Sequence, residues 1–233
     1  MKRNRVNIVT LGCSKNTVDS QKLMRQLEAG GYSVTAESSD PADIVIINTC
    51  GFIHDAKEES VDTIIRHAES LKKEGRGKLF VMGCLVERYR NDLQNELPEV
   101  DGWFGVNRPQ EIISRMGLAY KQELTGERII TGPAHYAYLK VSEGCDRTCA
   151  FCAIPDIRGR YISEPMENLV EEAKKLATGG VRELILIAQD LTLYGLDLYG
   201  KQMLPELVTR LTEIRDLGWV RLHYLYPSDF PME

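Results

Sequence analysis

The chain has 233 residues, 27% charged and 43% hydrophobic, with a formal net charge of −5. This length suits one to two domains with a well-buried core, and the composition excludes disordered, collagen-like and low-complexity chains. No apolar run approaches the roughly 18 residues of a membrane span, and the charge balance argues against a dedicated nucleic-acid-binding protein, although not against a local basic patch.

The first 132 residues alternate between short apolar runs and amphipathic stretches. The apolar runs predict strands at Arg5–Leu11, Asp43–Asn48, Lys78–Met82 and Gly102–Val106. Helical spacing of apolar residues predicts helices at Asp19–Ala29, Asp55–Glu74, Glu87–Glu96 and Arg108–Arg115. Alternation of this kind, with continuous apolar strands, predicts an α/β domain: an N-terminal open parallel sheet with helices on both faces.

Three dispersed cysteines each lie just past the end of a predicted strand: Cys13, Cys50 and Cys84. Ligands of parallel α/β sheets bind outside the carboxyl ends of the strands, so the three thiols fall on the ligand-binding edge. Each cysteine alone could be a small buried hydrophobe. A zinc site usually has a tight Cys pair and a fourth ligand, and His54 is the only nearby histidine. Three thiolates without an obvious fourth ligand favour an iron–sulfur cluster with one open iron.

The second half opens with a strand predicted at Tyr136–Ser142, followed by a dense cysteine motif. Cys145, Cys149 and Cys152 form the pattern C-x3-C-x2-C. A short loop of this kind can wrap three thiolates around a four-iron cluster and leave the fourth iron free for a small chelating ligand. A zinc knuckle is the alternative, but no fourth Cys or His follows closely.

The rest of the second half repeats the strand–helix pattern. Helices are predicted at Met166–Thr178 and Leu204–Ile214, and strands at Glu183–Ala188 and Trp219–Leu225. This is the repeating unit of a (β/α) barrel, whose sites lie at the carboxyl ends of the strands. Gln189 and Asp190 follow the second strand and so share a face with the cysteine loop.

Only three barrel strands precede Glu233, which follows a turn at Tyr226–Pro231. Three parallel strands cannot close a barrel, so we expect the chain to be part of a longer protein and inactive as it stands. The predicted domains are residues 1–132 and residues 133–233.

The N-terminal residues Met1–Asn7 are polar and basic and lead directly into a strand, which predicts no signal peptide and a cytoplasmic protein. In that compartment six cysteines indicate metal or redox chemistry more than disulfides.

The cysteine loop resembles that of the radical S-adenosylmethionine enzymes, and with the three dispersed cysteines the chain resembles their methylthiotransferase subgroup. Within it, four stretches are similar to the RimO branch, which modifies a ribosomal protein: Leu11–Asn16, Asp19–Ser20, Gly144–Pro155 and Ile157–Gly159. The tRNA-modifying, MiaB-like branch usually has Gln-Met-Asn at Ser14–Asn16, Asn at Asp146 and Gln-Asn at Gln189–Asp190.

The resemblance implies two [4Fe-4S] clusters and S-adenosylmethionine as cofactors. Cys145, Cys149 and Cys152 would hold the cluster that binds and reductively cleaves S-adenosylmethionine to a 5′-deoxyadenosyl radical. Cys13, Cys50 and Cys84 would hold an auxiliary cluster implicated in sulfur insertion at the β-carbon of an aspartate. Phe151 would lie near the adenine and Gln189 near the methionine amino group, although ordinary core packing is an equal reading of Phe151. Arg158 and Arg160 could stabilise the carboxylate of S-adenosylmethionine or a substrate acid, but exposed loop arginines are more often solvated, and we expect that for both.

The implied partners are a small-subunit ribosomal protein and an external electron donor, with no membrane. Two alternatives remain open at this point. One is a tRNA adenosine methylthiotransferase of the MiaB-like branch, and the other is a metal-binding module without catalysis.

Overall fold

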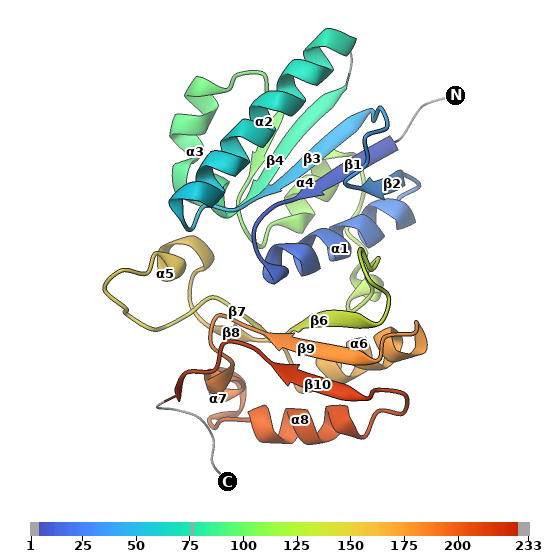
Figure 1. The fold of residues 1–233 in the computed structure, drawn as a ribbon, viewed down its shortest axis with the longest axis vertical. Helices are drawn as coiled ribbons and strands as arrows, with labels where there is room; N and C mark the ends of the chain where they lie inside the picture. Colours follow the sequence, from blue (N-terminus) through green and yellow to red (C-terminus); the bar gives the residue numbers. More distant parts are fainter. Residues whose placement is uncertain (1–4, 76, 228–233) are drawn as a thin grey trace. The chain divides into compact units, whose positions relative to one another are not determined.

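The computed structural model describes residues 5–75 and 77–227 (Figure 1). The contacts within the chain divide it into two units, one ending at Leu124 and the other beginning at Thr125. Part of the predicted turn at Tyr226–Pro231 and of the polar segment Met1–Asn7 lies outside the described residues.

The first unit is built on an open parallel sheet, as predicted, and this sheet has five strands in the order β2-β1-β3-β4-β5. The strands are β1 (Arg5–Thr10), β2 (Ser33–Ala36), β3 (Ile44–Thr49), β4 (Lys78–Gly83) and β5 (Gly102–Phe104). The edge strand β2 was not predicted. It has four residues of alternating partial exposure, which lack the continuous apolar run of the central strands.

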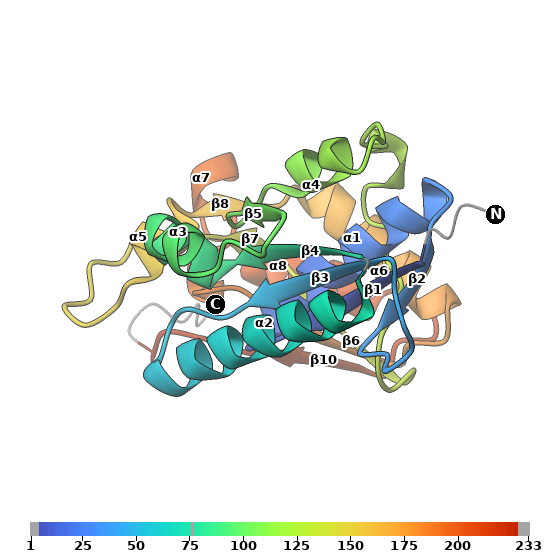
Figure 2. The ribbon, with the colours of Figure 1, turned by 90° about the horizontal axis from the view of Figure 1, so that it is seen from above.

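Helices cover both faces of this sheet, as the sequence predicts (Figure 1). They are α1 (Ser14–Ala29), α2 (His54–Glu74), α3 (Cys84–Glu96) and α4 (Pro109–Arg115), followed by the short 3-10 helix η1 (Gln122–Leu124). Ile64 of α2 and Leu85 of α3 pack with Val45 and Val81 in one apolar cluster. Figure 2 shows α2 running alongside β3 and β4.

Two of these helices begin earlier than predicted. The sequence places their starts at Asp19 and Glu87, whereas α1 begins at Ser14 and α3 at Cys84. The extra first turns are polar or interrupted in their apolar spacing, so periodicity does not detect them. As a result α1 begins directly after Cys13, and α3 begins at Cys84.

The second unit has a three-stranded parallel sheet of order β10-β9-β6, in agreement with the first part of a (β/α) barrel. Its strands are β6 (Tyr136–Lys140), β9 (Glu183–Ile187) and β10 (Trp219–Leu222). A short antiparallel ribbon, β7 (Ser142–Glu143) with β8 (Ile162–Ser163), was not predicted, because two-residue strands leave no periodic signal.

Helices α6 (Met166–Thr178) and α8 (Leu204–Thr212) pack their apolar faces on this sheet. The remaining helical segments are α5 (Ile154–Arg158), η2 (Leu191–Leu193) and α7 (Leu196–Tyr199). The core joins Leu139 of β6, Leu186 of β9, Leu169 of α6 and Leu207 of α8, all of which are buried.

Residues 125–132 pack with the second unit, although the sequence places the domain boundary after residue 132. The Arg128 guanidinium donates to the carbonyl oxygen of Tyr138, and its Nε lies 3.2 Å from a carboxylate oxygen of Glu172. Both charged side chains are almost fully buried. Ile130 packs against the core of the same unit.

Among the helices of residues 5–75 and 77–227, none combines the length and the apolar character needed to cross a bilayer.

Candidate functional site: two cysteine trios at the carboxyl ends of strands

The three dispersed cysteines follow neighbouring strands of the first sheet. β1, β3 and β4 are adjacent and parallel, and Thr49 of β3 pairs with Gly83 of β4. Cys50 and Cys84 are the next residues after that pair, and neighbouring strands lie about 4.8 Å apart. The sheet register therefore places these two cysteines side by side, and Cys13 follows the next strand along.

Each of these cysteines has a glycine beside it, and two of the glycines permit close contact between the strand-end loops. A Cβ on Gly12, which has φ +88°, would lie 2.5 Å from Cβ and 2.9 Å from Sγ of Cys50. A Cβ on Gly51 would lie 2.7 Å from Cα of Leu85 and 2.9 Å from the carbonyl carbon of Cys84. The loop after β1 thus touches the loop after β3, which touches the first turn of α3.

Hydrogen bonds from two buried amide side chains, those of Asn16 and Asn48, fix the loops after β1 and β3. Asn16 Nδ2 donates to the carbonyl oxygens of Leu11 and Thr49 at 2.8 and 3.0 Å. Asn48 Nδ2 donates to the carbonyl oxygen of Asn16 and to Ser20 Oγ, each at 3.0 Å. Buried polar groups whose bonds are satisfied in this way hold a unique geometry.

The Cys50 backbone has a hydroxyl partner on α2. Its amide donates to Ser60 Oγ at 3.1 Å, and the same hydroxyl lies 3.0 Å from the Cys50 carbonyl oxygen. Ser60 is fully buried, so its hydroxyl is committed to this contact and to the Ala56 carbonyl at 2.7 Å.

Helix starts add favourable electrostatics to the first trio. Cys13 immediately precedes α1 and its carbonyl accepts from the Thr17 amide at 3.2 Å, while Cys84 is the first residue of α3. The N-terminal end of a helix carries a partial positive charge that stabilises anions. Thiolate ligands at Cys13 and Cys84 would gain from it.

Cys13, Cys50 and Cys84 form no disulfide; Cys84 is buried, and Cys13 and Cys50 are half-buried. Three thiols at one partly open sheet edge, backed by helix N-termini, fit the donor set of an iron–sulfur cluster with one open iron. Within residues 5–75 and 77–227, no three Cys, His, Asp or Glu side chains converge tightly enough to hold a single metal ion. His54 is largely exposed.

The second trio lies on one contiguous loop after β6. The Cys145 amide donates to the Gly159 carbonyl oxygen, and the Cys152 amide donates to that of Cys149, each at 3.0 Å. Gly144, with φ +71°, admits the close approach of the Arg160 carbonyl, which a Cβ would meet at 2.0 Å. These contacts join the start of the loop to the residues after α5.

A buried ion cluster stands directly before this loop. Glu143 lies 2.7 Å from Lys140 Nζ and 2.8 Å from Arg158 Nη1. Burial by itself would raise the pKa of Glu143, but the two cations lower it to about 2. The reading of Arg158 as a solvated loop residue is wrong: its side chain is 1% exposed and fully engaged with Glu143, a partner fifteen residues away. Arg160 is exposed and pairs with Asp146.

The segment after β9 supplies a buried carboxylate. Asp190 Oδ1 accepts from the amide and hydroxyl of Thr192 at 2.9 and 2.5 Å, and Oδ2 accepts from Nε of Arg147 at 2.5 Å. Burial raises the pKa of the neighbouring Cys145 thiol, and Asp190 raises it further, while the Arg147 amide opposes the shift. A bound metal ion would reverse this preference for the neutral thiol.

The two predicted cofactor contacts have different surroundings. Phe151 is 91% exposed at the tip of the loop, and Gln189 is half-buried at the end of β9. Both stay predictions. The sequence did not predict the hydrogen bonds of Arg147, Asn16 and Asn48, most of which join residues far apart in the chain.

Comparisons with known proteins match both halves of the chain. Residues 5–105 match the uncharacterized protein family UPF0004, and residues 139–231 match the radical SAM superfamily. The ribosomal protein uS12 methylthiotransferases RimO of Phocaeicola vulgatus and Bacteroides thetaiotaomicron are each 55% identical over the whole chain. That of Porphyromonas gingivalis is 56% identical over the whole chain.

Over its whole length the chain is similar to these RimO proteins. It spans about half the length of the curated RimO relatives it matches, 54% of each of these three. The predicted resemblance to the RimO branch of the methylthiotransferases is thereby confirmed.

Solved structures share the fold at much lower identity. The radical S-adenosylmethionine methyltransferase TsrM from Kitasatospora setae, solved with cobalamin and a [4Fe-4S] cluster bound, has a TM-score of 0.64 at 15% identity. The match covers 99% of this chain and 57% of TsrM. The cobalamin-dependent radical enzyme OxsB has a TM-score of 0.56 at 12% identity, over 91% of this chain and 37% of OxsB.

Proposed function

We propose that the intact protein is a radical S-adenosylmethionine methylthiotransferase that adds a methylthio group to the β-carbon of an aspartate of ribosomal protein uS12. One observation carries the proposal above the others. Three cysteines follow adjacent parallel strands in the first unit, three more share one loop after β7 in the second, and the relatives that match the whole chain are named as uS12 methylthiotransferases.

The two trios have separate tasks in this proposal. Cys145, Cys149 and Cys152, in the predicted domain 133–233, would hold a [4Fe-4S] cluster that supplies the electron for cleaving S-adenosylmethionine. Cys13 and its two partner cysteines, in the predicted domain 1–132, would hold a second cluster at which sulfur is presented. A low-potential centre of this kind implies an external electron donor.

The residues of this chain bind and orient, while the cofactors supply the difficult chemistry. The glycine contacts and the Asn16 amide hold the first three thiols at one edge, and the ion pairs of Glu143 and Asp190 hold the second loop. In the proposal, Gln189 contacts the amino group of S-adenosylmethionine and Phe151 closes on its adenine. A ribosomal substrate implies a cytoplasmic protein.

Anaerobic reconstitution of the intact protein with iron and sulfide tests the proposal. Near eight irons per chain are expected, and a uS12 peptide containing the target aspartate should gain the mass of one methylthio group. A gain on unmodified tRNA instead would assign the protein to the MiaB-like alternative. Zinc as the only bound metal would establish the metal-binding module and overturn the enzyme.

Two single variants separate the roles of the trios. Cys149→Ala should abolish cleavage of S-adenosylmethionine, since it removes a ligand of the loop cluster. Cys50→Ala should retain cleavage but form no methylthio product. Loss of both activities in the Cys50→Ala variant would contradict the division of labour.

A further inference from the structure

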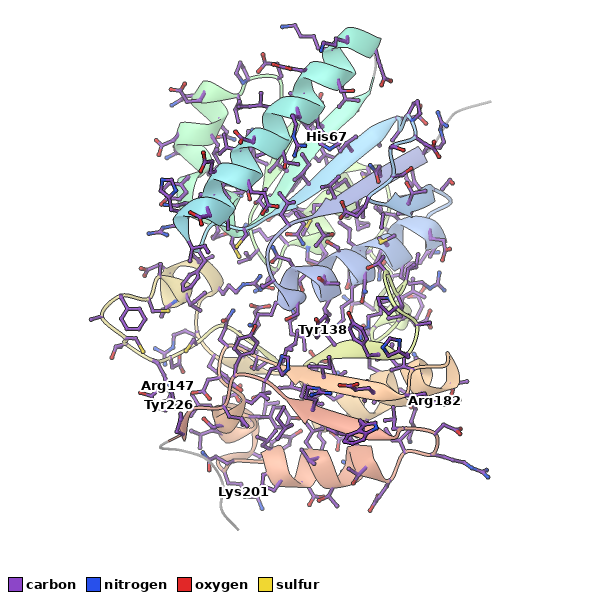
Figure 3. The ribbon with its side chains drawn as sticks, viewed as in Figure 1. His67, Tyr138, Arg147, Arg182, Lys201 and Tyr226 are labelled. Carbon is purple, nitrogen blue, oxygen red and sulfur yellow. The ribbon has the colours of Figure 1, made fainter. Side chains whose placement is uncertain are left out.

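Arg147 joins the segments that follow all three parallel strands of the second unit. It lies midway between Cys145 and Cys149 in the loop after β6. Its Nε donates to Asp190, which follows β9, at 2.5 Å. Its guanidinium carbon lies 3.7 Å from the ring centroid of Tyr226, beyond β10, and Figure 3 shows the two side chains together. One side chain thus connects the cysteine loop to both neighbouring strand ends.

The carboxylate that receives Arg147 is rigidly supported. Asp190 is 4% exposed at its side chain, and Thr192 occupies its second oxygen. The Tyr161 hydroxyl donates to the Asp190 carbonyl oxygen at 3.1 Å, and the Leu191 amide donates to that of Tyr224 at 3.0 Å. These hydrogen bonds fix the position of the Asp190 carboxylate. Removal of the Arg147 guanidinium would leave this buried carboxylate without its ion-pair partner.

The other ion pair of the loop has a different environment. Arg160 Nε lies 2.7 Å from Asp146 Oδ1, but their side chains are 88% and 40% exposed. Exposed pairs of this kind contribute little to stability. Farther along the loop, Phe151 is 91% exposed. Arg147 is 23% and Asp190 4% exposed, so this pair is much better shielded from solvent than the Arg160–Asp146 pair.

We propose that Arg147 and Asp190 form a positioning pair that holds the first half of the cysteine loop on the sheet edge before any cluster is bound. Cys145 is then preset, and Cys149 and Cys152 complete the ligand set as the cluster enters. Prior ordering of a loop lowers the entropy lost on binding. The proposal rests on the proposed function only in taking an iron–sulfur cluster as the ligand of this loop.

Hydrogen exchange in the intact, cluster-free protein tests the ordering directly. In Arg147→Met, the amides of Cys145 and Thr192 should exchange at least tenfold faster than in the wild type, while those of Leu139 and Leu186 in the core strands keep their rates. Arg160→Met, the matched control, should stay within twofold of the wild type everywhere. Equal exchange at Cys145 in wild type and Arg147→Met would overturn the proposal.

Iron retention gives a second readout. In a background with Cys13, Cys50 and Cys84 replaced by alanine, iron binds only the loop. A ferrous chelator should remove it at least tenfold faster from Arg147→Met and from Asp190→Asn, a change of about 1.4 kcal/mol. The double variant should lose iron no faster than the faster single variant, because the two residues act as one unit. The positioning pair would be contradicted if each single variant lost iron within twofold of the parent rate. It would also be contradicted if the double variant lost iron at a rate that multiplied the two single effects.

Arg147→Lys is a second, milder variant that can be measured if Arg147→Met does not fold. Lysine keeps the charge opposite Asp190 but loses the planar guanidinium that stacks on Tyr226. At least threefold faster iron loss is expected, and no change would count against the pair. Neither measurement uses the substrate, so both remain decisive if the wild type makes no methylthio product. If the background protein retains no iron, the proposed function fails and the exchange data alone decide on the positioning pair.

Discussion

Replacement of Gly12 by alanine tests whether the strand-end loops of the first unit are packed as closely as the structure shows. Gly12 has φ +88°, and an added Cβ would meet Cys50 at 2.5 Å. Gly31, at the end of α1, is the matched control, because it has φ +90° but nothing within 4 Å of the added Cβ. Both variants incur the left-handed backbone strain of about 1–2 kcal/mol. Only Gly12→Ala also forces atoms together.

The difference between the two variants isolates the contact with Cys50. Overpacking a well-filled site typically costs about 1–3 kcal/mol, so Gly12→Ala should be less stable than Gly31→Ala by that amount. With a urea slope of about 1–3 kcal/mol per molar, the unfolding midpoints should differ by roughly 1 M. Trp103 is buried in the first unit, and Trp219, in the second, is the only other tryptophan. Fluorescence in a Trp219→Phe background therefore reports the first unit alone.

Iron binding adds a functional measurement to the same pair of variants. Displacement of Cys50 should weaken iron retention by the first trio in Gly12→Ala and leave it unchanged in Gly31→Ala. Coincident urea midpoints for the two variants would show that the loops after β1 and β3 are not in contact, and the reasoning about the first trio would be refuted.

Three further predictions concern buried polar groups. Ser60→Ala should destabilise the first unit by about 1–2 kcal/mol through its lost backbone bonds, whereas Ser70→Ala, exposed on the same helix, should have no effect in the same urea assay. Glu143 has a folded pKa of about 2, below its unfolded value near 4.5, so its stabilisation is complete above pH 4.5 and disappears as the pH falls toward 2. Glu143→Gln should flatten that part of the stability–pH curve, and an unchanged slope would contradict the ion cluster. Arg128→Met should cost about 3–5 kcal/mol in urea unfolding, because it leaves Glu172 charged and buried, and a second change of Glu172 to leucine should recover much of the loss.

Local patterns in the sequence were sufficient for the main architecture. The central strands β1, β3 and β4 are continuous apolar runs, which are typical of a sheet covered by helices on both faces. Each of these strands was predicted to within one residue at either end. Since the carboxyl ends of parallel strands share one edge, the positions of Cys13, Cys50 and Cys84 on that edge follow from the strand predictions.

Features that depend on distant partners could not be predicted. Arg158 has the sequence context of an exposed loop residue, yet Glu143 holds it inside the protein. Asn16 occupies a polar turn that gives no helical signal, but its amide reaches the carbonyl oxygen of Thr49, thirty-three residues away. The Arg147–Asp190 pair spans forty-three residues. Such contacts exist only once the strands are in register, so no local window contains them.

The two cysteine trios therefore depend on the fold in different ways. The first trio is discontinuous: the sheet register and the glycine contacts at Gly12 and Gly51 set the spacing of its thiols, so any change in strand packing should disturb all three. The second trio is contiguous, and its spacing is encoded in one loop that buried ion pairs hold at Arg147 and Arg158. Its half-buried members, Cys149 and Cys152, lie between those two anchors in the sequence. Variants of the anchors should consequently weaken cluster binding in the second unit without unfolding its core, whereas in the first unit cluster binding and stability should fall together.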